Sequence, residues 1–155
     1  MDLDELLFGK ISKYFKKRKK EKILLDNNAV FLKDIKPRLT ILARAITGKP
    51  IEIFAAEREG GYKNNSFFLP VYFNELNSKE SNLNFYFFRI LFLSIQFDLN
   101  INLIADEYFS NEKKQQILDI LFSKYPNIKS IFNELNTHFK SKETPKNTAD
   151  FSWIY

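Results

Sequence analysis

The chain has no cysteine and a single histidine, His138, among its 155 residues. Without cysteine it has neither a thiol nucleophile nor a disulfide framework, and one histidine cannot form a zinc site of the Cys/His kind. Glycine is scarce, with four residues, so a glycine-rich loop around a phosphate group has almost no place to form. We therefore expect no catalytic residues, no metal and no cofactor, and a protein that is not an enzyme.

Positive charge is concentrated at one end of the chain. Residues 1–50 hold 13 of the 24 Lys and Arg but only 6 of the 19 Asp and Glu, and residues 51–155 are slightly acidic. Most of the excess comes from one cluster: Lys16, Lys17, Arg18, Lys19, Lys20 and Lys22. Such a cluster suits the carboxyl end of a solvated helix, an acidic partner, or a nucleic acid or lipid phosphate. We favour the helix end and keep a nucleic-acid-binding protein using residues 16–22 as the alternative function.

No apolar run is long enough to cross a membrane. The longest, from Leu83 to Phe97, is interrupted by Arg89 and falls short of the roughly 20 residues that a spanning helix needs. Asp2 and Asp4 stand where a secretory signal requires positive charge. We expect a cytoplasmic protein without a transmembrane segment.

Apolar spacing predicts about five helices. The first covers residues 2 to about 20. A second, which Pro37 starts or kinks, ends at Gly48 and Pro50. The run from Leu83 to Phe97 is apolar nearly all round, which predicts a central helix covered on several sides. Two more helices, starting near Ser110 and Pro126, are expected to form an antiparallel pair.

Two short strand-like segments interrupt this helical pattern. Residues 51–56 and 66–69 flank a polar loop in which Gly60-Gly61 and Asn64-Asn65 can adopt positive φ. We predict a β-hairpin near residues 51–70, and hence an α+β, mainly α fold in one domain over residues 1–140. Residues 141–155 read as a linker-like tail whose apolar end, from Phe151 to Tyr155, is expected to be the stump of a longer architecture.

Few side chains suggest chemistry. Arg89, placed in the apolar helix, must be paired if it is buried, and we expect a structural ion pair or a set of backbone carbonyls, with a ligand-binding arginine as the less favoured interpretation. His138 is expected at the surface or an interface. The carboxylate pairs Glu57 with Glu59 and Asp106 with Glu107 would need a cleft to act as acid and base, and we expect them to face solvent.

Four segments of the middle of the chain carry a family resemblance: Leu42 to Ile53, Ala56-Glu57-Arg58-Glu59-Gly60-Gly61-Tyr62, Ser66 to Pro70, and the predicted helix from Asn84 to Leu91. Together they resemble the N-terminal region of NorD-type nitric oxide reductase activation proteins. The resemblance covers roughly residues 39–100. It implies an accessory protein that works with a MoxR-type AAA+ ATPase in metalloenzyme activation, usually through a von Willebrand factor A domain.

The chain departs from that pattern at its end. The metal-binding motif of a von Willebrand factor A domain is Asp-x-Ser-x-Ser, and Asp150-Phe151-Ser152-Trp153-Ile154 lacks the second serine. We therefore expect a truncated relative that is a non-enzymatic interaction module.

Its partner would be a protein, and the resemblance implies a MoxR-type ATPase or a von Willebrand factor A domain. The expected binding surface is the hairpin loop, with Glu57, Arg58, Glu59, Gly60, Gly61 and Tyr62. A small hydrolase or transferase that pairs Glu57 or Glu59 with Arg58 in a cleft is a further alternative.

Overall fold

The computed structural model describes residues 9–10, 13, 27–56, 60–101 and 107–141. Its elements, in chain order, are β1 (Val30–Phe31), α2 (Leu32–Thr47), β2 (Glu52–Ala56), β3 (Gly61–Lys63), β4 (Ser66–Pro70), β5 (Tyr72–Phe73), α3 (Lys79–Asp98), α4 (Glu107–Lys124) and α5 (Ile128–Ser141). Most of the helix predicted over residues 2–20 lies outside the described residues, although Gly9, Lys10 and Lys13 are helical.

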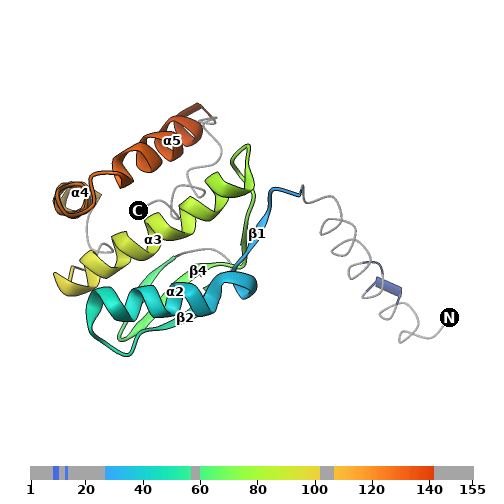
Figure 1. Cartoon of the computed structure of the whole chain (residues 1–155), viewed down its shortest axis with the longest axis horizontal. Coiled ribbons are helices and arrows are strands. Elements are labelled where there is room, and N and C mark those ends of the chain that lie inside the picture. The colour runs from blue at the N-terminus through green and yellow to red at the C-terminus, as the bar shows by residue number, and fades with distance from the viewer. Residues whose placement is uncertain (1–8, 11–12, 14–26, 57–59, 102–106, 142–155) are drawn as a thin grey trace.

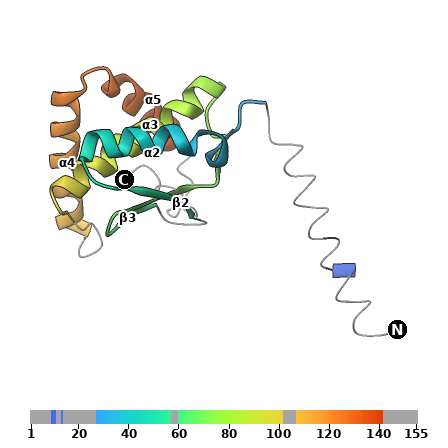
Figure 2. The same cartoon turned by 60° about the horizontal axis from the view of Figure 1, so that its bottom comes forward.

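Helix α3 lies at the centre of the fold. Figure 1 shows α2 and the strands on one side of it and α4 and α5 on the other, and Figure 2 shows β2 and β3 beneath α2 and α3. The helix begins where Ser78, in an extended conformation, accepts a hydrogen bond from the Ser81 backbone N–H, which is how a serine N-cap satisfies a free donor. The prediction of a central apolar helix is confirmed.

Aromatic side chains of α3 reach its neighbours in several directions. Phe85 stacks on Phe73 of β5 with ring centroids 3.7 Å apart, and Phe97 meets Phe67 of β4 edge-on at 6.1 Å. On the opposite side, Phe88 lies 5.7 Å from Phe132 of α5. Large rings bury much apolar area each, so these contacts supply much of the core.

The sheet differs from the predicted hairpin. The prediction that residues 51–56 and 66–69 pair as a hairpin is wrong, because β2 and β4 run parallel, with Phe54 opposite Phe68. The tight hairpin joins β3 to β4 through Asn64-Asn65, where Asn64 adopts φ 53°. The strand order is therefore β2-β4-β3, so β3, which follows β2 in the chain, lies on the far side of β4. A separate two-residue antiparallel pair joins β1 to β5.

Helix α2 ends as predicted but begins earlier. Gly48 takes the left-handed conformation, φ 65°, and its N–H donates to the Arg44 carbonyl, which closes the helix. The helix begins at Leu32 and Pro37 lies inside it. Of the two expectations for Pro37, that it starts the helix or kinks it, the first is therefore wrong. The β1–β5 pair holds this early start, since the Leu32 N–H donates to the Val71 carbonyl at 2.9 Å.

Helices α4 and α5 do not form the expected antiparallel pair. Figure 1 views α4 end-on while α5 lies across the picture, so the two helices cross steeply. Helix α4 begins at Glu107, before the predicted start near Ser110, and α5 begins at Ile128, close to Pro126. Both helices pack against α3, where α4 buries Ile117, Leu118 and Leu121 and α5 buries Ile128, Leu135 and Phe139.

The observed class is α+β and mainly α, as the sequence predicts. Four helices longer than three turns are bounded within the described residues, against about five expected for the whole chain. None of the described helices is long and apolar enough to cross a membrane.

Two leucines of α3 test how the core depends on this helix. Leu93 is fully buried, whereas Leu91 is only partly buried. We expect Leu93→Ala to lower the free energy of unfolding by about 3–5 kcal/mol, because a buried cavity remains, and Leu91→Ala by about 1–2 kcal/mol. Urea denaturation followed by circular dichroism measures both, and equal losses would contradict the placement of α3.

Candidate interaction surface

The structure reaches only part of the predicted binding surface. Glu57, Arg58 and Glu59 lie outside the described residues, as do the basic cluster at residues 16–22, Asp106 and the tail from residue 142 onward. Gly60, Gly61 and Tyr62 are described, and Arg89, His138 and the backbone of Glu107 are described as well. The partner-binding role of residues 57–62 remains a prediction.

Tyr62 has an internal role. It is partly buried, its hydroxyl donates to the Ile101 carbonyl at 3.1 Å, and its ring meets Phe97 edge-on at 5.7 Å. Desolvation raises the pKa of this hydroxyl above its usual value. Tyr62 thus ties β3 to the end of α3, which fixes one side of the loop that the sequence singled out.

Cations border strand β2. Strand β2 is the outer strand of its sheet, and no described strand pairs with its free edge. Along the neighbouring flank of α2, Lys36 places its Nζ 5.6 Å from the ring centroid of Phe54, and the Arg44 Nε donates to the Ile51 carbonyl at 2.9 Å. Lys33 lies in the same sector of the helix as residues 36 and 44, and its Nζ is 5.9 Å from the ring centroid of Phe31 of β1. We call this the β2 edge surface: β2 with Lys33, Lys36 and Arg44.

Apolar side chains are exposed next to these cations. Phe54 is 41% exposed on β2 and stacks on Phe68 of β4 with centroids 6.0 Å apart. Ile41, on the outward face of α2, is 70% exposed. An exposed strand edge with a ring and cations offers main-chain hydrogen bonds, apolar contact and positive charge together.

A polar stripe runs along one face of α3, a helix that otherwise looks apolar. Asn82, Arg89 and Gln96 recur every seven residues, and all three are buried. Two helical turns come close to seven residues, so the three side chains share one face. Arg89 is the residue predicted from the sequence. The seven-residue spacing of polar residues within an apolar run is the signal that could have found Asn82 and Gln96.

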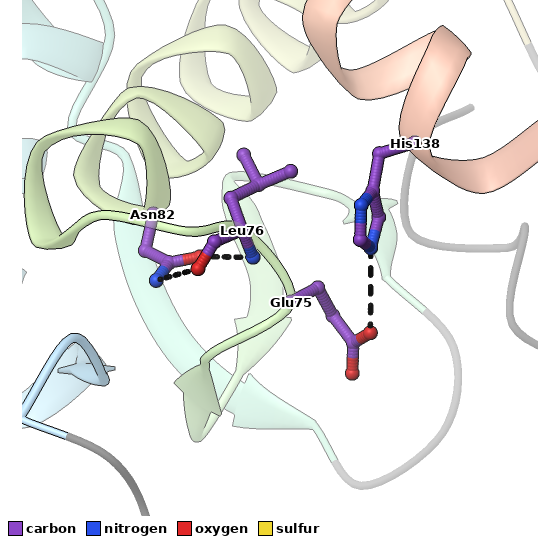
Figure 3. A network of polar contacts seen from close by, with 4 residues as sticks. All are labelled: Glu75, Leu76, Asn82 and His138. Carbon is purple, nitrogen blue, oxygen red and sulfur yellow. Dashed lines mark hydrogen bonds and ion pairs between the residues drawn. The ribbon is translucent and has the colours of Figure 1, made fainter. Parts of the chain in front are cut away.

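Asn82 holds the segment before α3. Its Oδ1 accepts from the Leu76 N–H at 2.8 Å, and its Nδ2 donates to the carbonyls of Leu76 and Asn28 at 3.2 and 2.9 Å. Figure 3 shows this amide turned toward the backbone of Leu76. A buried amide that satisfies donors and acceptors of two distant segments orders both of them.

Glu75, the residue before Leu76, is held from the other side. The His138 Nε2 on α5 lies 3.9 Å from the Glu75 Oε2, and Figure 3 shows the two side chains facing each other. Helix α3 and helix α5 thus fix neighbouring residues of one loop. His138 is partly buried at this contact between α5 and the loop.

Arg89 differs from its two neighbours on the stripe. It is fully buried, and within the described residues its Nε and Nη1 have no hydrogen-bond partner, so the predicted carboxylate or carbonyl partner is not found there. Its Cζ lies 5.5 Å from the centroid of the Phe92 ring. Desolvation lowers the pKa of the guanidinium to about 9, which keeps it charged at neutral pH.

Gln96 closes the stripe. Its Nε2 donates to the Ile101 carbonyl at 3.1 Å, the same oxygen that accepts from the Tyr62 hydroxyl. This shared acceptor joins the end of α3, the segment after it and strand β3. Both ends of the stripe are therefore satisfied by backbone groups.

A groove of about 380 Å³ separates α4 from α5. Its floor is apolar and its rim carries amides and lysines, and the lining residues are Asn111, Lys114, Gln115, Leu118, Phe122, Phe132, Asn136 and Lys140. The groove holds no carboxylate or imidazole that could act as acid or base. In the described part of the chain, no group of three or more His, Asp or Glu lies close enough to hold a metal ion.

The chain matches no family model, no curated protein and no solved structure at a significant level.

Asn82 provides a test of the stripe. We expect Asn82→Ala to lower the free energy of unfolding by about 2–4 kcal/mol, because three hydrogen bonds are lost and buried backbone groups are left unpaired. Asn133→Ala, at an exposed position of α5, should change it by less than about 0.5 kcal/mol. Thermal denaturation compares the two variants, and a small effect of Asn82→Ala would place the amide outside the core.

Proposed function

We propose that this chain is a non-enzymatic interaction module that binds an acidic, extended protein segment along the β2 edge surface. The single observation that carries the proposal is the outer strand β2 bordered by cations of α2. A peptide that adds a strand to such an edge gains affinity from main-chain hydrogen bonds and specificity from its side chains.

The basic side chains on and near α2 favour an acidic segment as the binding partner. Five basic side chains are exposed over residues 32–49, with one acidic side chain, Asp34, among them; the basic residues are Lys33, Lys36, Arg38, Arg44 and Lys49. Complementary charge steers encounter and fixes the register of a bound segment. Apolar side chains alternating with the acidic ones would contact Phe54 on the strand.

The resemblance of residues 39–100 to NorD-type proteins implies a partner class, a MoxR-type AAA+ ATPase or a von Willebrand factor A domain. This residue range includes the second half of α2 with Arg44, strand β2 and the hairpin, whereas Lys33 and Lys36 precede it. A partner of that class would present its acidic segment here.

Peptide binding tests the proposal. A short fluorescein-labelled peptide of alternating valine and glutamate should bind the full chain, and its valine and lysine counterpart should not. We expect the double variant Lys33→Glu with Lys36→Glu to weaken binding at least about tenfold, because like charges then face each other. Fluorescence anisotropy at physiological salt measures the dissociation constants.

Two controls test whether the peptide binds at β2 and whether it binds as an added strand. Lys124→Glu, an exposed charge reversal at the end of α4, should leave the affinity unchanged. A peptide with proline at alternate positions lacks the N–H donors that a strand edge requires and should not bind. Equal weakening by Lys124→Glu, or unimpaired binding of the proline peptide, would contradict strand addition at β2.

The alternative function, nucleic-acid binding through residues 16–22, gives a different outcome. Binding of a DNA duplex should then exceed binding of the acidic peptide and fall steeply with added salt, because phosphate contacts release counterions. Replacing the six basic residues of the cluster by glutamine would abolish that binding without affecting the peptide.

A further inference from the structure

The groove between α4 and α5 has an aromatic floor. Phe122 of α4 and Phe132 of α5 line it with ring centroids 5.4 Å apart, and both side chains are only partly buried. Leu118 of α4, which is buried, continues the apolar surface. The space over this floor, about 380 Å³, is typical of pockets that hold small organic groups. The groove is therefore large enough to receive an aromatic side chain.

The rim of the groove is positively charged. Lys114 and Lys140 line it, and Lys129 places its Nζ 6.0 Å from the centroid of the Phe122 ring. Among the described residues that line the groove, none is acidic. An occupant that combines apolar side chains with a negative charge would match both the floor and the rim.

The chain carries such a segment after α5. Residues 150–155, Asp150-Phe151-Ser152-Trp153-Ile154-Tyr155, combine one acidic residue with four large apolar ones. They lie outside the described residues. From the sequence, their apolar side chains are expected to belong to a longer architecture, because apolar surface left in water forgoes the free energy of burial. The groove offers these side chains a place within the chain itself.

Helix α5 ends beside the groove. Lys140, in its last turn, lines the groove, and the helix ends at Ser141. Phe132 lies eight residues before Lys140, which is about 12 Å along the helix axis. The connecting residues 142–149 can span up to about 29 Å, so residues 150–155 can turn back over the whole groove. A connection this short gives a high local concentration, so even a weak contact would form.

We propose that residues 150–155 dock into the groove between α4 and α5 of the same chain. Their aromatic side chains would contact Phe122 and Phe132, and Asp150 would face the lysines of the rim. The groove and the β2 edge surface lie on opposite sides of α3 (Figure 1). The docking goes beyond the proposed function, and either proposal can fail without the other.

Trp153 is the only tryptophan of the chain, so its fluorescence reports on this segment. We compare the full chain with two variants of α5. Asn136→Glu adds a carboxylate to the lining of the groove, and Thr137→Glu adds one at the next position, which is exposed and does not line it. The emission maximum and the quenching by acrylamide are measured in dilute protein, and circular dichroism checks that each variant is folded.

In the unsubstituted chain and in Thr137→Glu, we expect blue-shifted emission that acrylamide quenches weakly. Asn136→Glu should shift the emission to the red and increase the quenching. The reason is that its carboxylate would be desolvated by the apolar segment and would repel Asp150, which should weaken docking at least about tenfold.

The absence of cysteine allows a direct measurement of position. A bimane label, which a nearby tryptophan quenches, is attached in Asn136→Cys or, as the control, in Lys63→Cys on β3. Each labelled chain is compared with the same chain carrying Trp153→Phe. We expect Trp153 to quench the label at position 136 and not the label at position 63, to the same extent at every protein concentration.

Four results would overturn the proposal. If acrylamide reaches Trp153 equally well in all three chains, the segment is undocked, and if Trp153 is equally protected in all three, it docks elsewhere. A label at position 136 that Trp153→Phe leaves unchanged excludes the groove, and this measurement decides if Asn136→Glu does not fold. Quenching that disappears on dilution would assign the groove to residues 150–155 of a second copy.

Discussion

Helix α3 must be covered on nearly every side, and the rest of the fold follows from that requirement. Its aromatic and aliphatic side chains point in all directions, so no single layer of structure could bury them. Helix α2 and the strands cover one side, and α4 and α5 cover the other. Each covering element is itself amphipathic or short and gains most of its stability from contact with α3, because isolated helices and two-residue strand pairs are marginal in water.

A helix so apolar would tolerate many rotations about its axis, and the polar stripe restricts them. The Asn82 amide bonds to backbone groups before the helix, and the Gln96 amide bonds to the Ile101 carbonyl after it. These directional bonds hold one rotation and one register, whereas apolar contact alone is non-directional. Arg89, in the middle of the stripe, has the same placement but no comparable bonds within the described residues. The two amides therefore order the fold through bonds to the backbone, and Arg89 contributes to the core through its contact with the Phe92 ring.

The surface of the molecule is organised differently from its core. Strand β2 lies at the margin of a small sheet, and the flank of α2 beside it carries basic side chains. The unpaired backbone groups of a strand edge can form hydrogen bonds with another chain, and natural proteins often place charged side chains there to prevent it. Basic side chains outnumber the exposed acidic ones, Asp34 on α2 and Glu52 on β2. This excess of positive charge discourages pairing with another basic edge and favours a segment of opposite charge. The core therefore stabilises the fold, whereas this surface is the one that we propose for binding.

The sequence itself predicts the features that depend on neighbouring residues. The apolar runs of α3 and α5 and the glycine that ends α2 follow from periodicity and backbone preference, which act over a few residues. The mainly helical α+β class follows from the same signals. The tertiary structure alone decided the parallel pairing of β2 with β4, the steep crossing of α4 and α5, and the acceptors of Asn82 and Gln96. Strand composition does not encode direction, since Phe54 and Phe68 can face each other in either arrangement. Hydrogen bonds such as that from Asn82 to Asn28 join residues far apart in the chain, so no local pattern reports them.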